Sequence, residues 1–358
     1  MRSAISEWFR KNFVDPDIVM LTLAIIAGIG VIVLFGHLIM PVLASIVIAY
    51  LLEGLVTALE RKGLPRFPAV LIVFIAFLLF VAAIVLWLLP LFSRQLTQLV
   101  QQLPNILAQA QAALLALPEK YPELISAQQV QDITNIISQE IAGLGQHILT
   151  FSISSVVGLI TLSIYLVLMP LLVFFFLKDK DLILGWFGRF LPLENPLSKK
   201  VWRDVDRQIA NYVRGKFVEI IIVFSACYVA FSLLGLQYAL LLAVLVGLSV
   251  IIPYVGAAVV TIPVIAIAWF QWGGWSNDFL WVAGVYFVIQ ALDGNVLVPL
   301  LFSEVVNLHP VAIIVAILIF GGVWGFWGVF FAIPLATLVQ SILSAWPRRS
   351  GGRAARAD

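Results

Sequence analysis

Long apolar segments recur along almost the whole chain, and they constrain its fold more than any other feature. They cover residues 18–35, 37–55, 68–92, 151–177, 217–235, 239–270, 279–302 and 311–346. Most reach the ~20 residues that a helix needs to cross the ~30 Å hydrocarbon core of a bilayer. The composition agrees, because 62% of the residues are hydrophobic and only 11% are charged, whereas soluble domains have about 25% charged residues. The sequence therefore predicts a polytopic membrane protein.

The lipid environment also predicts the secondary structure. The apolar segments lack the alternation of apolar and polar residues that marks the strands of a membrane barrel. In lipid, every backbone N–H and C=O needs a partner, and a helix supplies these partners within one segment. We therefore expect an all-α fold. The single cysteine, Cys227, allows no intrachain disulfide, and a net charge of +2 gives no indication of a nucleic-acid partner.

Lysine and arginine residues are unevenly distributed between the loops. They gather in the N-terminal segment and in residues 53–67, 178–216 and 347–358. By contrast, residues 93–150 contain only Arg94 and Lys120. Cytoplasmic loops carry an excess of basic residues, so we predict that both termini face the cytoplasm and that 93–150 lies outside. Three spans before residue 93 give the same orientation.

Five regions follow from these observations. They are a three-span region (1–92), extracytoplasmic amphipathic helices (93–150), two spans with a basic cytoplasmic linker at 178–216 (151–235), a hairpin core (236–346) and a basic tail (347–358). The apolar faces of the amphipathic helices need a cover, which is the protein's own bundle, a second subunit or lipid. The basic amphipathic stretch 197–216 is expected to lie on anionic headgroups.

Two of the apolar segments are interrupted by residues that break or loosen helices. Segment 239–270 contains the tetrad PYVG (253–256), and segment 311–346 contains the tetrad GFWG (325–328). Each tetrad is followed within seven residues by an Ile-Pro pair. The halves are short for spans, and the loop charges favour an even number of crossings for each. The sequence thus predicts two hairpins that form an inverted repeat, as in secondary transporters. The alternative is that Gly and Pro merely kink ordinary spans.

One ionisable residue lies in the apolar segment between the two breaks. Asp293 is the only acidic or basic residue between 279 and 303, with Gln290, Gly294 and Asn295 close to it. A charge at this depth costs about 2.5 kcal/mol or more and usually faces a cavity. We predict that this cluster contacts a substrate, a cation or a proton. The alternative is a neutral, hydrogen-bonded Asp293 or one that caps a broken helix.

Further candidates lie at the two breaks and near the membrane boundary. The breaks add Pro253, Tyr254, Gly256, Gly325 and Gly328 as residues along the substrate path. Secondary candidates are Glu304, Asn307, His309 and Glu219. Each of these also has an ordinary role. His309 and Asn307 are suited to the start of the second hairpin, and Glu219 is suited to an ion pair with Lys216 or Arg214.

Motifs of other function classes are lacking. The triplet GLS (247–249) lacks the glycine that should follow a serine nucleophile. Neither a zinc-protease motif nor a nucleotide-binding loop is present. We therefore expect no enzyme, no cofactor and no metal site. A membrane scaffold or regulator without transport activity remains the alternative function.

Six short stretches together resemble the autoinducer-2 exporter (AI-2E) family. They are VFFFLKDKD (173–181), NYVRGK (211–216), IIPYVGA (251–257), QALDGNVLVPLLFSE (290–304), VNLHP (306–310) and GFWGVFFAIPLA (325–336). The resemblance implies a permease of the bacterial inner membrane that exports a small polar solute or signal by secondary transport, coupled to an ion. Sodium/proton antiport is the alternative described for some relatives. The resemblance also implies a homo-oligomer, a pentamer, with a moving hairpin core.

Overall fold

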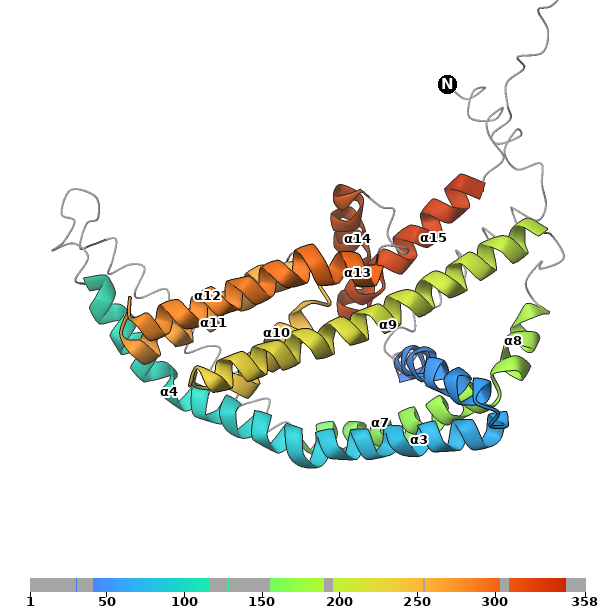
Figure 1. Cartoon of the computed structure of the whole chain (residues 1–358), viewed down its shortest axis with the longest axis horizontal. Helices are drawn as coiled ribbons and strands as arrows, with labels where there is room; N and C mark the ends of the chain where they lie inside the picture. Colours follow the sequence, from blue (N-terminus) through green and yellow to red (C-terminus); the bar gives the residue numbers. More distant parts are fainter. Residues whose placement is uncertain are drawn as a thin grey trace, which may run out of the picture. The chain divides into compact units, whose positions relative to one another are not determined.

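The computed structural model describes most of the apolar part of the chain. The residues it describes are Gly30, 41–115, Gln128, 155–189, 196–253, 255–302 and 309–345. All regular elements in these ranges are helices (Figure 1), which confirms the all-α prediction. The segment 18–35, apart from Gly30, and residues 116–150, apart from Gln128, lie outside the described residues.

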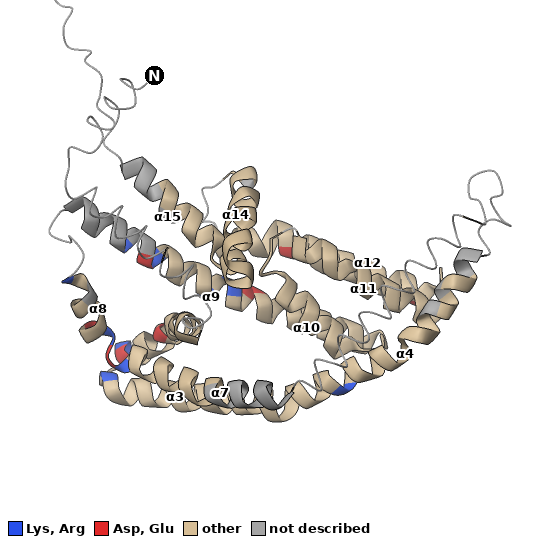
Figure 2. Ribbon diagram, turned by 180° about the vertical axis from the view of Figure 1, so that it is seen from behind, with Lys and Arg blue, Asp and Glu red and all other residues tan. Residues whose placement is uncertain are grey.

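Six of the described helices are long and apolar enough to cross a membrane. They are Pro41–Arg61, Arg66–Ile106, Asp206–Leu233, Val255–Trp272, Asn277–Phe302 and Val311–Phe330. In Figure 2, long stretches of these helices carry no charged residue. A polytopic α-helical membrane protein is therefore confirmed.

The chain divides into two compact units, each built from separate stretches of sequence. The first unit takes its described residues from 1–73, 171–217 and 299–358, and the second from 74–170 and 218–298. All four boundaries fall inside helices, namely α3 (Arg66–Ala83), α7 (Ser155–Lys178), α9 (Pro196–Leu233) and α13 (Val298–Phe302). The chain therefore passes between the units along helices and not through loops.

A charged cluster connects three segments of the first unit. The Arg66 guanidinium lies 3.4 Å from Glu53 and 3.3 Å from Glu60, and it donates a hydrogen bond of 2.7 Å to the Leu177 carbonyl at the end of α7. Lys180, at the start of α8 (Lys180–Gly188), lies 3.0 Å from Glu53. The charges alternate in sign, so they hold the basic segment after α7 against the start of α3.

An aromatic cluster anchors α9 within the same unit. The Tyr212 hydroxyl donates a 3.0 Å hydrogen bond to the Phe330 carbonyl, and its ring packs against Phe302. Lys216 Nζ lies 5.1 Å from the centroid of the Phe302 ring. Gly215 permits this approach, because a Cβ there would lie 2.7 Å from the Phe302 ring. The stretch NYVRGK therefore packs against the end of α13 and of α14 (Pro310–Phe330).

The second unit is built around a core of buried apolar side chains. Its helices are the distal part of α9, α10 (Ala239–Ser249), α11 (Val255–Trp272), α12 (Asn277–Leu292) and α4 (Leu89–Leu115). Helices α11 and α12 lie side by side (Figure 1). Leu96 and Leu99 of α4 pack against this core, and Gln95 Oε1 accepts a hydrogen bond from the Leu241 N–H. The apolar face of α4, the first amphipathic helix, therefore packs against the protein's own helices, which is one of the three alternatives given above.

Two helices continue where the sequence suggested separate elements. The apolar stretch 68–92 runs on into the amphipathic α4, and the basic stretch 197–216 and the next span form the single 38-residue helix α9. A π-helix, η1 (Ile84–Leu88), joins α3 to α4 and lies directly before Leu89-Pro90. Proline lacks an N–H and clashes with the carbonyl four residues earlier. A wider turn accommodates it, so the helix continues.

Replacing Arg66 by Met tests the charged cluster. The variant loses the hydrogen bond to Leu177 and the contacts with two carboxylates, so unfolding should become about 1–2 kcal/mol easier. Thermal unfolding of the purified protein should shift down by a few degrees. The matched control is Arg61→Met, at an exposed position. Equal unfolding temperatures for the two variants would contradict this account.

Candidate functional site

The first break in the chain forms the tip of a helical hairpin. Helix α10 ends at Ser249, the turn includes Pro253, and α11 begins at Val255 and packs against α10. A Cβ atom at Gly256 would overlap the Ser249 carbonyl oxygen. Only glycine allows the new helix to begin this close to the end of the old one. Helix α11 has 18 residues and continues through Pro263.

One side chain closes the base of this hairpin. Gln271, near the end of α11, accepts a 2.7 Å hydrogen bond from the Gln237 N–H and donates a 2.8 Å bond to the Gly235 carbonyl. Both partners precede α10 in the chain. The two ends of the hairpin therefore lie beside each other, and its tip projects away from them.

The second break shows the same local arrangement. Gly325 adopts φ 59° and ψ −136°, so α14 consists of two helical pieces. A Cβ at Gly328 would overlap the Phe320 carbonyl oxygen, as a Cβ at Gly256 would overlap that of Ser249. Helix α15 (Ala332–Ala345) then packs against α14. The fourth position of PYVG and of GFWG thus has the same steric role, which confirms the likeness of the two tetrads at the level of the backbone.

A chain of hydrogen bonds connects this first hairpin to α12. Tyr286 is fully buried, and its hydroxyl lies 2.8 Å from Thr261 Oγ1 of α11 and 2.7 Å from Gln290 Nε2. Thr261 uses its only proton to donate to the Ala257 carbonyl at 2.7 Å. The Tyr286 hydroxyl must therefore donate to Thr261 and accept from the Gln290 amide. Along this row of hydrogen bonds, each group donates to the next, from Gln290 of α12 to the Ala257 carbonyl in the half of α11 near the tip.

Asp293 lies one turn beyond Gln290, where α12 changes its winding. Its N–H bonds back to the Gln290 carbonyl, and its own carbonyl accepts from the Val298 N–H, which is the bond of a π-helix. This π-helix, η2 (Asp293–Leu297), again directly precedes a proline, Pro299. Turns of this kind are frequent at functional sites. Asp293 is half-buried, and it is the only acidic or basic residue from 279 to 302.

The other two members of the predicted cluster lie apart from this chain. Asn295 is exposed and donates a 2.8 Å hydrogen bond to the Ala291 carbonyl of its own helix. Gly294 is also exposed, and a Cβ there would meet nothing within 4 Å. Of the predicted cluster, Gln290 and Asp293 therefore share one line along α12, whereas Asn295 and Gly294 face away from the buried tyrosine.

The secondary candidates have distinct positions. His309 caps α14, because its Nδ1 accepts a 3.3 Å hydrogen bond from the Val311 N–H, the role that was suggested for Asn307. Glu219 is 1% exposed and lies one turn after Lys216, which is 4% exposed. Burying a carboxylate is costly, so Glu219 remains a candidate. Tyr254, Glu304 and Asn307 lie outside the described residues.

Sequence reasoning missed Thr261 and Tyr286. Tyrosine and threonine are ordinary residues in membrane helices, so neither residue stands out from the apolar segment around it. The available signal was the spacing of Tyr286 and Gln290, since residues four apart lie on one face of a helix. The pairing with Thr261 could not be read from the sequence, because it depends on how α11 packs against α12.

Known proteins match this chain over nearly its whole length. A family model described as "AI-2E family transporter" matches residues 20–348. The chain is 46% identical over 350 residues to "Putative permease PerM" of Escherichia coli strain K12, which covers 97% of this chain and 98% of that protein. It is 27% identical over 317 residues to "Putative transport protein YueF" of Bacillus subtilis, covering 87% of this chain and 84% of the relative.

The six long apolar helices define a multi-pass membrane protein, and the matches to known proteins place it among transport proteins. The chain belongs to the AI-2E family of transporters.

Alanine substitutions test the two hairpin tips. At Gly256 and Gly328 an added methyl group would overlap a backbone carbonyl, so each variant should lose about 3 kcal/mol of stability. Gly284→Ala and Gly322→Ala are matched controls, because a Cβ at either position meets nothing within 4 Å. Tryptophan fluorescence during heating would report the difference. Four equal unfolding temperatures would show that neither tip needs glycine.

Proposed function

We propose that this chain is a secondary transporter that exports a small polar solute or signal across the bacterial inner membrane. The observation that carries the proposal is the row of hydrogen-bonded side chains Thr261, Tyr286 and Gln290, centred on the buried Tyr286, which leads along α12 to Asp293. A structural core has no need for such a row of polar groups in an apolar helix bundle, because each must be satisfied at some cost. A path for a polar solute does need them.

The first hairpin is proposed to line this path, and the inverted repeat expected from the sequence is the reason to expect a transport role for the second hairpin as well. Backbone groups at a broken helix are free to meet a solute, and the N-terminus of α11 offers N–H dipoles near the first tip. Beside that helix, the hydrogen bonds among Thr261, Tyr286 and Gln290 hold their donor and acceptor groups in fixed positions. Tyr286 and Gln290 would hold a solute hydroxyl by exchanging the hydrogen bond between them for bonds to it.

Asp293 is proposed to couple transport to an ion. As a carboxylate it is costly in lipid, whereas a bound proton or sodium ion removes the charge. The ion would therefore shift the balance between the states of the transporter. The same residue favours sodium/proton antiport as the second candidate, since one carboxylate that binds either ion in turn is sufficient for exchange.

The proposal also includes the orientation of the chain in the membrane and its assembly into an oligomer. The basic residues of 178–216 and of the C-terminal tail support a cytoplasmic position for both termini, so that α4 lies outside. We extend the proposal to a homo-oligomer, which the family resemblance supports. A scaffold or regulator without transport would need neither Asp293 nor the polar chain.

Asp293→Asn should abolish coupled transport. In proteoliposomes, export-direction flux of autoinducer-2 and the pH response to a sodium gradient would be measured separately. We expect the variant to lose flux by about tenfold or more, as loss of a charged partner implies, and to lose its dependence on the pH gradient. Asp278→Asn is the matched control, because Asp278 is an exposed acid in the first turn of the same helix.

The flux experiment has four informative results. Loss of autoinducer-2 flux supports export, and loss of the sodium response alone supports antiport. Unchanged flux in Asp293→Asn would refute the role of this residue. Absence of both activities from folded, inserted wild-type protein would favour the scaffold alternative.

Cysteine labelling tests the orientation. The native Cys227 is buried, so background labelling by a membrane-impermeant maleimide should be low. Gln98→Cys, at an exposed position of α4, should react in intact spheroplasts. Arg189→Cys, after α8, should react only after the membrane is opened. The reverse pattern would contradict the predicted orientation.

A further inference from the structure

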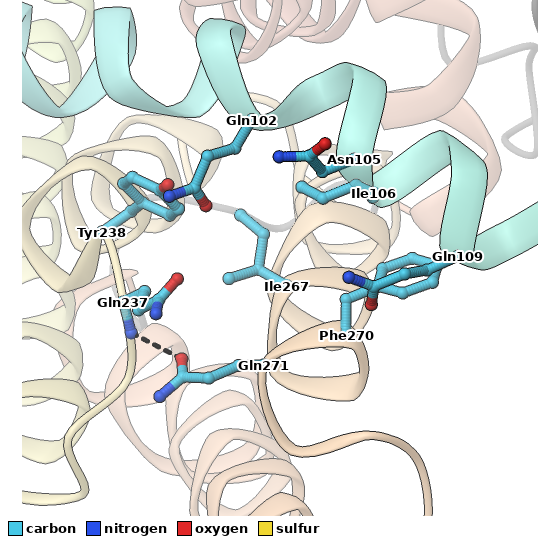
Figure 3. A pocket seen from close by; sticks show the side chains of 9 residues that line it. All are labelled: Gln102, Asn105, Ile106, Gln109, Gln237, Tyr238, Ile267, Phe270 and Gln271. Carbon is cyan, nitrogen blue, oxygen red and sulfur yellow. Dashed lines mark hydrogen bonds between the residues drawn. The ribbon is translucent and has the colours of Figure 1, made fainter.

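A polar pocket lies between α4 and the base of the first hairpin, away from the proposed transport path (Figure 3). Its volume is about 280 Å³. Five of the nine residues that line it carry carboxamides, namely Gln102, Asn105, Gln109, Gln237 and Gln271. None of the described residues that line it is charged. Such a concentration of amides in one small cavity is not needed for packing.

Three of the amides come from one face of α4. Gln102, Asn105 and Gln109 are spaced three and four residues apart, so they project from the same side of the helix, and Figure 3 shows them directed towards the hairpin base. All three are exposed, as is Gln237. Within the described part of the chain, the side-chain amides of these four residues make no hydrogen bond. Their donors and acceptors are therefore open to a ligand.

Gln271 differs from the other four amides. Its carboxamide is fully used in the two hydrogen bonds that close the hairpin. It therefore fixes the wall from which Gln237 and Tyr238 project. The cavity is pre-formed by the same bonds that hold the hairpin ends together, so a ligand need not order the backbone to bind.

Tyr238 supplies a second, independent sign of a built site. It is the one non-glycine residue with positive φ (57°) among the described residues, and it is only 8% exposed. A bulky residue in this conformation is strained, and strain of this kind gathers at ligand-binding sites. Burial raises the pKa of its hydroxyl, so the group remains a proton donor at neutral pH. Ile267 and Phe270 add an apolar surface beside it.

We propose that this pocket binds a neutral, hydroxyl-rich solute of the size of a monosaccharide. Each carboxamide offers both a donor and an acceptor, which matches hydroxyl groups that also do both. The lack of charged lining residues disfavours ionic ligands, whose desolvation would find no compensating charge. The apolar side chains suit the C–H face of a sugar ring. The volume is too small for an oligosaccharide.

Binding at this pocket does not depend on transport. Only the side of access, which is extracytoplasmic, rests on the proposed orientation. A neutral sugar would bind between α4 and the hairpin base and would add bonds between them. The site could thus be occupied in a protein whose transport path is inactive, and the two proposals can fail separately.

Saturation-transfer NMR on the full chain in nanodiscs tests the proposal directly. D-Ribose and D-glucose are the neutral probes, and glucuronate and glucosamine are their charged counterparts. We expect transfer to the neutral sugars and at least fivefold less to the charged ones. The double variant Gln102→Leu/Gln109→Leu should weaken binding by about tenfold or more, since it removes two amides. Gln98→Leu/Gln101→Leu, on the same helix but outside the lining, should bind as wild type does.

Protection of an introduced thiol gives a second measurement. Asn105→Cys should be alkylated readily, and 50 mM of a bound neutral sugar should slow the reaction at least threefold, whereas Gln98→Cys should be unaffected. Asp293→Asn should retain sugar binding even if it loses flux. No saturation transfer to either neutral sugar, equal transfer to the charged sugars, or equal weakening in both double variants would overturn the proposal.

Discussion

The requirement that every backbone polar group find a partner away from water governs this structure. A helix meets it until a proline or a glycine interrupts the bonds, so each interruption needs a local remedy. At Pro90 and Pro299 the remedy is a preceding π-helix, which widens the turn and keeps the helix continuous. At Gly256 and Gly328 the chain reverses, and the missing side chain lets the new helix approach a carbonyl of the old one.

The same requirement applies to buried side chains, and it places the polar groups of the second unit. Tyr286, Thr261 and Gln290 satisfy one another in an ordered row. Asp293 follows at the start of the π-helix. There its carbonyl accepts a hydrogen bond from the N–H five residues later, whereas in a regular α-helix the partner is four residues later. The row of polar side chains thus leads along regular helix to an irregular turn that carries an acidic residue, and an acidic residue at this depth usually faces a cavity.

The two proposals assign separate tasks to the two ends of one hairpin. Near its tip half, Thr261 belongs to the polar row proposed to serve transport. At its base, Gln271 closes the hairpin and shapes the amide-lined pocket. A ligand at the base would stabilise the attachment of α4 to the hairpin without touching Asp293. Binding and transport therefore become separable properties of a single helical element.

The sequence by itself determined the class of the fold, the two broken segments and the position of Asp293, because apolar length and isolated charges are local properties. It also identified the glycines of both tips, since the two tetrads share a pattern. It did not show that the helix before α4 continues past Pro90, because a π-helix accommodates that proline. It also did not show that the basic stretch 197–216 and the following span form one helix, because no residue pattern marks whether two adjoining helical stretches are continuous. Only the tertiary structure placed Tyr286 against Thr261 and gathered five amides from two distant stretches, because those contacts depend on helix packing and not on spacing along the chain.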